Sequence, residues 1–225
     1  MTYHKPNNTP PESIAIIGGG GHALVVAEAA AMQNVRIDGF FDDIIAAHIA
    51  RTRSPLGPIT HLGTLNELER LANRAWIVAI GDPHIRRRVL QDLSMFGHGE
   101  PATIIHPRAF VSHSAVIGRG VYIGPNAIIQ AQATVQDHAV INSGAIIEHD
   151  AQIGENAHIA PGCVLGGGVI VGPDALVGLG SRVLPRLSIG ARSVVGAGAM
   201  VTRSVNDGST VVGVPARESV RTARV

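Results

Sequence analysis

The second half of the chain carries one aliphatic position in every six residues. Ile, Val or Leu occupies each sixth position from Ile105 to Val201 without a break in phase, and the residue four places later is usually small, as at Ala127. Because six is an even number, these side chains return to one face of an extended strand, which an α-helix would not allow. Sandwich strands would need turns of varying length that break the phase. The pattern therefore predicts a parallel β-helix of hexapeptide repeats.

Most other positions of the repeat are polar and are expected to face outward. A few outward positions are apolar, which is more than an isolated β-helix is expected to expose to water. They are Ile128, Val164, Ile170 and Leu176. We expect this surface to contact other copies of the chain.

The first hundred residues alternate short apolar runs with segments of good helix formers. Strands are expected at residues 14–17, 35–41, 76–80 and 103–105, and helices at 23–32, at 64–71 and from 82 to about 97. Thr64 and Glu67 have the spacing of a capping box, and Asp82-Pro83 that of an N-cap followed by a first helical residue. Strands that alternate with helices indicate a parallel, Rossmann-like sheet.

These patterns divide the chain into four parts. We expect a flexible N-terminus at residues 1–12 and a Rossmann-like domain at 13–102. The β-helix domain is expected at 103–206, followed by a C-terminal segment at 207–225.

Composition excludes several classes of protein. Among 225 residues the net charge is +1 and only 3% are aromatic, which argues against nucleic-acid binding. The one cysteine, Cys163, falls at an inward position, so no internal disulfide framework is expected and a reducing cytoplasm fits. The apolar stretch at 14–32 contains four consecutive glycines and Glu28, unlike a signal peptide, and no run reaches the about eighteen apolar residues of a membrane span.

A glycine-rich turn follows the first expected strand. Gly18, Gly20 and Ala23 match a dinucleotide-binding fingerprint, and Asp42 lies at about the right distance beyond it. The domain has room for about one βαβ half, which favours a mononucleotide diphosphate over NAD. Two interpretations stay open, because the glycines also suit a tight turn without a ligand, and Asp42-Asp43 also suits the end of a strand.

Among eleven histidines, His149 has the most informative surroundings. It lies at an expected outward corner of the repeat between Glu148 and Asp150. A carboxylate beside an imidazole fixes its tautomer and raises its basicity, as a general base near neutral pH requires. His158 is expected at an outward strand position along the same groove. The other outward histidines, at positions 106, 113 and 138, lack a flanking pair of acids.

Several segments together resemble the NeuD/PglD family of bacterial sugar acetyltransferases, over nearly the whole chain. This family acetylates sialic acids or nucleotide-linked amino sugars. The matching segments are Ile16-Ile17-Gly18-Gly19-Gly20-Gly21-His22, Phe40-Phe41-Asp42-Asp43, Val78-Ala79-Ile80-Gly81, Ile104-Ile105-His106-Pro107, the stretch from Ile141 to Asp150, and Val212-Gly213-Val214-Pro215-Ala216.

The resemblance implies a left-handed β-helix, which is a rare exception to right-handed crossovers. It also implies a homotrimer with acetyl-CoA lying between neighbouring β-helices, and no metal. His149 would take the proton from the acceptor amine, with Asp150 tuning its basicity. If the side chain of Asp150 is too short, the tuning passes to Glu148 or is lost.

The resemblance further assigns binding residues. The nucleotide-sugar contacts would be turn amides and His22 at the diphosphate, with carboxylates at the base or ribose: Gly20, Gly21, His22, Asp42, Asp43 and Gly81. The acetyl-CoA contacts would be His158, Gly167, Leu179 and Ala197. Arg217, Arg221 and Arg224 either meet the 3′-phosphate of CoA or only solubilise the C-terminal tail.

The predicted function is N-acetylation of a nucleotide-linked amino sugar by direct transfer from acetyl-CoA. His149 would act as general base, and a backbone N–H near Gly167 would stabilise the oxyanion. Cys163 is a poor nucleophile at an inward position. The alternatives are O-acetylation of a sialic acid or related sugar, a nucleotide-dependent oxidoreductase, and a non-catalytic scaffold. The sequence does not identify the sugar, the base or the pathway.

Overall fold

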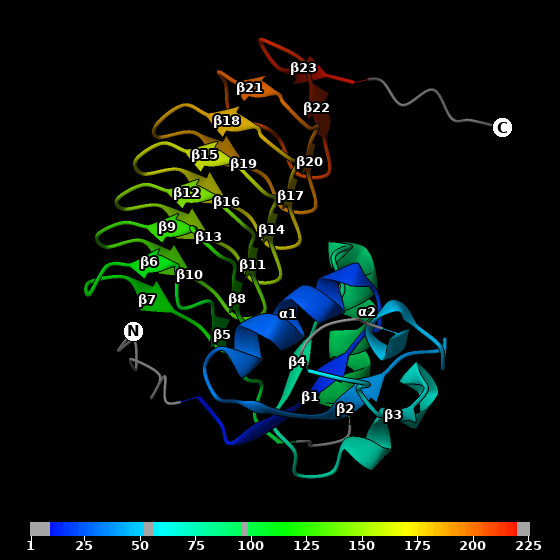
Figure 1. The fold of residues 1–225 in the computed structure, drawn as a ribbon. Helices are drawn as coiled ribbons and strands as arrows, with labels where there is room; N and C mark the ends of the chain where they lie inside the picture. The colour runs from blue at the N-terminus through cyan, green and yellow to red at the C-terminus, as the bar shows by residue number, and fades with distance from the viewer. Residues whose placement is uncertain (1–9, 52–55, 96–98, 220–225) are drawn as a thin grey trace, which may run out of the picture.

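The computed structural model describes residues 10–51, 56–95 and 99–219. An α/β domain is followed by a long column of stacked coils that rises from it (Figure 1). The expected architecture, a Rossmann-like domain followed by a left-handed parallel β-helix, is confirmed. The expected flexible segment at 1–12 lies mostly outside the described residues.

The N-terminal domain is built on a parallel sheet with strand order β3-β2-β1-β4. Its strands are β1 (Ser13–Ile17), β2 (Arg36–Phe41), β3 (His61–Gly63) and β4 (Trp76–Val78). Its helices are α1 (Gly21–Ala31) and α2 (Pro83–Ser94), with short 3-10 segments η1 (His48–Arg51) and η2 (Leu65–Leu71). The sheet is half of a doubly wound fold, as its length predicts.

The capping residues act as their spacing predicts, with one difference in helix type. The carboxylate of Asp82 accepts hydrogen bonds from the backbone N–H groups of His84 and Ile85 at the start of α2. Glu67 closes a capping box with Thr64. The segment after Thr64 is nevertheless a kinked 3-10 helix rather than an α-helix, because Glu67 itself has non-helical dihedral angles.

The β-helix repeats every three strands, so that each strand away from its two ends pairs in parallel with the strand eighteen residues before it and the strand eighteen after it. The first sheet contains β5 (Ile104–Ile105), β8 (Tyr122–Ile123), β11 (Val140–Ile141), β14 (His158–Ile159), β17 (Leu176–Val177), β20 (Val194–Val195), β22 (Thr210–Val212) and β23 (Arg217–Glu218). The second sheet contains β6 (Phe110–Val111), β9 (Ile128–Ile129), β12 (Ile146–Ile147), β15 (Val164–Leu165), β18 (Arg182–Val183) and β21 (Met200–Val201). The third sheet contains β7 (Val116–Ile117), β10 (Thr134–Val135), β13 (Gln152–Ile153), β16 (Ile170–Val171) and β19 (Ser188–Ile189).

The interior of the β-helix is filled by the residues that the period predicts. Ile141, Ile147 and Ile153 are fully buried, as are small partners such as Ala145. Each corner from residue 120 to residue 198 places one residue in the left-handed region, at every sixth position. Glycine, asparagine and aspartate are the residues that tolerate this conformation best.

The β-helix extends beyond the part of the sequence that keeps the six-residue period. Residues 207–212 were expected in a separate C-terminal segment, but β22 pairs in parallel with β20 and continues the first sheet. Val205 and Val211 remain buried although both are out of phase with the six-residue series that ends at Val201. The coil is therefore closed by packing after the sequence period has ended, which corrects the predicted boundary at 206.

The first sheet also carries the domain junction. The outward side chains of Tyr122 and Val140 pack into the same hydrophobic cluster as residues of α1 and β1. This contact covers part of the first sheet, whereas the second and third sheets face away from the N-terminal domain (Figure 1). Within the ranges described above, no helix combines the length and the apolar character needed to cross a bilayer.

The alternation of buried and exposed positions predicts opposite outcomes for two neighbours on β13. Replacing the fully buried Ile153 with Ala should lower the free energy of unfolding by about 2–5 kcal/mol, because it opens a cavity in the stack. Replacing the exposed Gln152 with Ala should change it by less than about 0.5 kcal/mol. Denaturant unfolding measures both, and equal losses would contradict the assigned faces.

Candidate active site

His149 lies at the corner between the second and third sheets. Ile147 of β12 points into the stack, and two residues later the chain turns outward, leaving the His149 side chain 63% exposed. Its Nδ1 lies 2.7 Å from Oδ2 of Asp150. The carboxylate accepts a hydrogen bond from Nδ1–H, which leaves the lone pair of Nε2 free. This is the arrangement of a general base with an orienting acid.

Asp150 meets two requirements at once. Its φ of 60° makes it the left-handed residue of this corner, a conformation that aspartate tolerates better than most side chains. Its carboxylate also reaches the imidazole of His149. The side chain is therefore long enough for the pairing, and Asp150 rather than Glu148 is the acid in contact with the ring.

Gly167 occupies the same corner one coil further along. A Cβ atom at this position would lie 2.6 Å from Nε2 of His149, so any side chain would displace the ring. The N–H of Gly168 donates to the carbonyl of His149, which ties the two corners together. Among the described residues, the N–H of Gly167 has no acceptor. The imidazole thus packs against a glycine whose amide donor is free.

The glycine-rich turn lies at the carboxyl edge of the N-terminal sheet, between β1 and α1. Gly18 has a φ of 110°, and a Cβ there would collide with Ile80 and Ala79. Gly20 and Gly21 are exposed, with open space around them at the start of α1. A helix N-terminus of this kind presents free N–H groups to an anion.

The two acids after β2 make structural hydrogen bonds. One oxygen of Asp42 accepts from the N–H of Gly19 at 2.7 Å and the other from the N–H of Ile44. Asp43 accepts from the N–H of Leu65. Both carboxylates therefore shape the loops around the turn, as the interpretation without a ligand predicts. Their remaining lone pairs stay available for a ligand.

His22 lies beneath the turn and is half-buried beside two other rings. Its centroid lies 5.3 Å from the ring of Tyr122 and 6.4 Å from that of His158. Burial, with the nearby positive groups, lowers the pKa of His22 to about 4, so the ring is neutral at neutral pH. Its Nε2 and the hydroxyl of Tyr122 are buried without partners among the described residues. A ligand at this position would meet a neutral imidazole rather than a cation.

His158 differs from its expected setting. It points outward from β14, but the N-terminal domain covers it, and the residue is only 9% exposed. Its Nδ1–H donates to the carbonyl of Gly81 at 2.7 Å, while Nε2 lies 3.3 Å from the amide of Asn142. Burial lowers its pKa to about 4. The outward position is as expected, whereas the cover that the N-terminal domain provides is not visible in the repeat.

The remaining expected cofactor residues lie at another corner. Leu179 and Ala197 occupy the corner between the first and second sheets, one coil apart, and the N–H of Gly198 donates to the carbonyl of Leu179. Leu179 is 59% exposed. A single chain thus gathers His149 with Gly167 at one corner and Leu179 with Ala197 at another.

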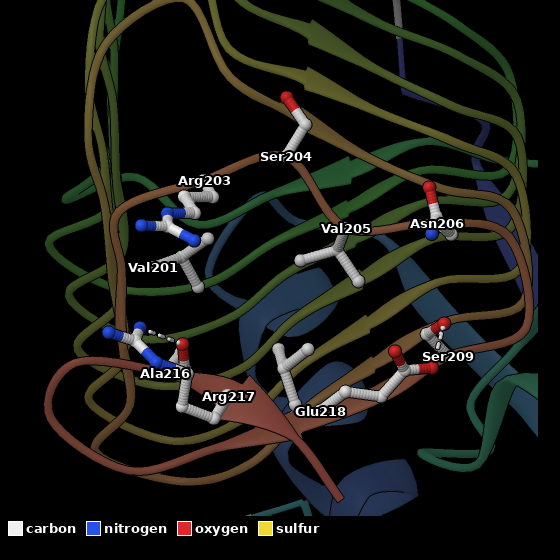
Figure 2. Close-up of a pocket in the computed structure, with 10 residues that line it drawn as sticks. Val201, Arg203, Ser204, Val205, Asn206, Ser209, Ala216, Arg217 and Glu218 are labelled. Atoms are coloured by element: carbon white, nitrogen blue, oxygen red, sulfur yellow. Dashed lines mark hydrogen bonds between the residues drawn. The ribbon is translucent and has the colours of Figure 1, made fainter.

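Other predicted groups have clear positions. A cavity of about 140 Å³ at the far end of the β-helix is lined by Arg203, Arg217 and Glu218, among others (Figure 2). Arg221 and Arg224 lie outside the described residues. Cys163 is buried, and burial raises the pKa of its thiol, which makes it a weak nucleophile. No group of three or more His, Cys, Asp or Glu side chains within the described ranges is arranged to hold a metal ion.

Sequence reasoning missed the residues at the domain junction. Tyr122 and Asn142 contact the predicted histidines, and Arg86 of α2 is buried against Asn156 of the β-helix. The sequence contains one sign of the role of Tyr122, since a large aromatic side chain at an outward position of the repeat suggests a covering domain. The sequence contains no sign that Arg86 is buried, because arginine in an amphipathic helix is usually exposed.

Comparisons with known proteins cover both domains. Residues 13–93 match the PglD N-terminal domain model, and residues 100–177 match the GMPPB C-terminal domain model. A UDP-N-acetylbacillosamine N-acetyltransferase of Bacillus subtilis (strain 168) is 39% identical over 114 residues, or 50% of this chain. That alignment spans only about half of the relative, 51% of its length.

Solved structures match over nearly the full chain. PerB from Caulobacter crescentus, in complex with CoA and GDP-perosamine, is 34% identical with a TM-score of 0.82. The match covers 92% of this chain and 97% of PerB. The acetyltransferase domain of PglB from Neisseria gonorrhoeae FA1090, in complex with acetyl coenzyme A, is 32% identical with a TM-score of 0.81 and is covered to 99%. With this fold, these motifs and relatives matched over almost their whole length, the chain belongs to the NeuD/PglD family of hexapeptide-repeat sugar acetyltransferases.

Proposed function

We propose that the protein transfers the acetyl group of acetyl-CoA to the amino group of a nucleotide-linked amino sugar. The observation that carries the proposal is the His149–Asp150 pair at an exposed corner, where Nε2 lies against Gly167, a residue whose N–H has no acceptor among the described residues. The relatives support this chemistry, since PerB was crystallised with CoA and GDP-perosamine and PglB with acetyl coenzyme A.

The transfer is direct in this proposal. The sugar amine attacks the thioester carbonyl, and Nε2 of His149 accepts the proton that the nitrogen loses. The N–H of Gly167 stabilises the negative oxygen of the tetrahedral intermediate. The C–S bond then breaks, and the imidazolium returns its proton to the departing sulfur. Asp150 holds the ring in the reactive tautomer and stabilises its charged form.

The N-terminal domain would hold the nucleotide sugar. The open turn at Gly20 and Gly21 offers backbone N–H groups at the start of α1 to the diphosphate. His22 would contribute one hydrogen bond as a neutral ring. Asp42 and Asp43 would meet a ribose or base with the lone pairs that their loop contacts leave unused. Gly81 would line the same edge of the sheet.

A homotrimer would complete the acetyl-CoA site. Within one chain, Leu179 and Ala197 lie at a different corner from His149, so a neighbouring copy is needed to bring the two sets together. The second sheet supports such contact, since its outward positions form an apolar ladder of Phe110, Ile128, Ile146 and Val164. His158 and Gly167 remain in the proposed cofactor set. The reduced, buried Cys163 fits a cytoplasmic protein.

The main rival is O-acetylation of a sialic acid or related sugar hydroxyl, which would use the same base and cosubstrate. The diphosphate-compatible turn beside α1 favours a nucleotide-linked acceptor over a free sugar. An oxidoreductase is disfavoured, because the sheet has only four strands and offers about half of a dinucleotide site.

Replacing His149 with Ala should lower kcat by roughly 100- to 10,000-fold, the usual contribution of a general base, while folding is retained. His113 provides a matched control, because it occupies the same corner two coils earlier with serines on both sides. The His113→Ala variant should keep the wild-type kcat. Steady-state kinetics with circular dichroism measure both, and near-normal turnover by His149→Ala would refute the assignment.

The product should carry the new acetyl group on nitrogen. Mass spectrometry after incubation of acetyl-CoA with a panel of nucleotide-linked amino sugars and free sialic acid should show one acetyl group added to an amino sugar. Resistance of that group to mild alkaline hydrolysis identifies an amide. Acetylation of sialic acid alone would establish the rival function instead.

Sedimentation should give the mass of three chains. Val164→Glu places a charge in the apolar ladder of the second sheet and should lower both the mass and the affinity for acetyl-CoA. Gln152→Glu, on the third sheet, should change neither. A wild-type monomer that binds acetyl-CoA would contradict the shared site.

A further inference from the structure

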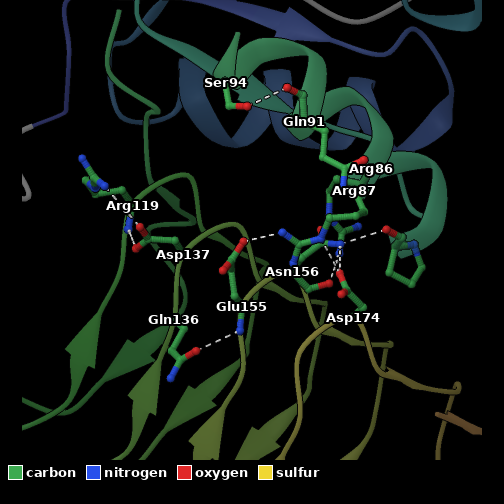
Figure 3. Close-up of polar contacts among 11 residues, drawn as sticks. Arg86, Arg87, Gln91, Ser94, Arg119, Gln136, Asp137, Glu155, Asn156 and Asp174 are labelled. Atoms are coloured by element: carbon green, nitrogen blue, oxygen red, sulfur yellow. Dashed lines mark hydrogen bonds and ion pairs between the residues drawn. The ribbon is translucent and has the colours of Figure 1, made fainter. Parts of the chain in front are cut away.

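A buried arginine links α2 to the β-helix. Arg86 is 1% exposed, and all three of its guanidinium nitrogens donate hydrogen bonds. Nε–H donates to Oδ1 of Asn156 at 2.6 Å, and one Nη donates to the carbonyl of the same residue at 2.8 Å (Figure 3). The other Nη donates to the carbonyl of Ile80 at 2.7 Å, close to that of Gly81. One side chain thus joins a loop of the N-terminal domain to a corner of the β-helix.

Asn156, the partner of Arg86, is also buried and hydrogen-bonded to both domains. It is fully buried and has a φ of 57°, as its corner of the β-helix requires. Its amide nitrogen donates to the carbonyl of Pro83 and to Oδ1 of Asp174, while its amide oxygen accepts from Arg86. The asparagine therefore contacts both domains, and both donors of its amide nitrogen and its amide oxygen are hydrogen-bonded.

The buried charge of Arg86 is costly and has only indirect compensation. Asp174 lies beyond the amide of Asn156 and is bonded directly to Arg87 instead. Burial lowers the pKa of Arg86 to about 10, so the group stays cationic at neutral pH. Apolar residues of similar volume often join two surfaces as stably as a buried ionic group. What they lack is the ability to hold particular carbonyl groups in place.

The carbonyls that Arg86 holds belong to the loop between β4 and α2. Ile80 lies against the glycine-rich turn, where a Cβ on Gly18 would meet it at 2.9 Å. The carbonyl of Gly81 also accepts a hydrogen bond from Nδ1–H of His158, which lies on the β-helix two residues after Asn156. The loop is thus fixed from both sides, next to the turn proposed to bind the nucleotide.

We propose that Arg86 and Asn156 form a positioning pair that fixes the loop at residues 80–81 against β14 and so sets where the nucleotide sugar lies relative to the β-helix. This inference rests on the proposed function for its kinetic consequence. Its structural content is independent of that function, since the loop geometry exists without substrate. The pair acts through the loop and does not touch the reacting atoms.

Arg87 offers a matched control. It also joins α2 to the β-helix, through ion pairs with Glu155 and Asp174, and it is 27% exposed. It has no hydrogen bond to the loop at residues 80–81. A general loss of domain contact should therefore appear in Arg87→Gln as well, whereas a loss of loop position should not.

The decisive variant is Arg86→Lys, which keeps the charge but not the planar set of donors. We expect its KM for the nucleotide amino sugar to rise at least about tenfold, because small misplacements of a bound substrate are costly in catalysis. Its KM for acetyl-CoA should stay within about twofold of wild type. Arg87→Gln should keep both KM values while its melting temperature falls. Equal effects of Arg86→Lys on both KM values would overturn the proposal.

Two further measurements keep the test decisive. Asn156→Gly tolerates the left-handed corner and should raise the same KM, so it replaces Arg86→Lys if that variant does not fold. Hydrogen exchange of the peptide spanning residues 76–86 needs no substrate and should be faster in Arg86→Lys than in Arg87→Gln. Unchanged exchange would reject the positioning role. A wild-type protein that acetylates no amino sugar would reject the proposed function alone, and the exchange result would still decide the role of Arg86.

Discussion

The stacking of one aliphatic side chain per hexad is the constraint on which the rest of the molecule depends. Close packing of these side chains holds the coils in register, so that a residue's place in the hexad decides whether it faces inward, outward or into a corner. His149 acquires its exposure and its neighbour Gly167 from this placement alone. The chemistry of the corner then comes from two local choices, a carboxylate on one side and a missing side chain one coil further along.

The N-terminal domain adds a second layer to this arrangement. By covering the first sheet it converts outward positions of the β-helix, such as Tyr122 and His158, into parts of a domain junction. Burial lowers the pKa of both His22 and His158, so both rings are neutral at neutral pH, and His158 meets the carbonyl of Gly81 through a hydrogen bond rather than an ion pair. The exposed His149 is a different kind of histidine, set apart by its solvent access and its acid partner.

Residues whose environment depends on local repetition were predictable, and those that depend on domain placement were not. The corner position of His149 and the cap at Asp82 followed from spacing, and the structure has both. The burial of His158 could not be predicted, because a domain distant in sequence covers its outward position. Arg86 escaped prediction for the same reason, and the end of the coils near Val211 did so because packing continues beyond the period. The roles of the binding residues remain predictions.

The left-handed corner also has a consequence for how such a protein can change. At the corner between the second and third sheets, the residue before the left-handed position points outward. Its side chain therefore takes no part in the packing of the interior. At this corner the successive coils carry His113, Ala131, His149, Gly167 and Pro185. These equivalent positions are about 4.8 Å apart. A reactive side chain can be placed at another of them, one or more coils away, without a change in the packed interior.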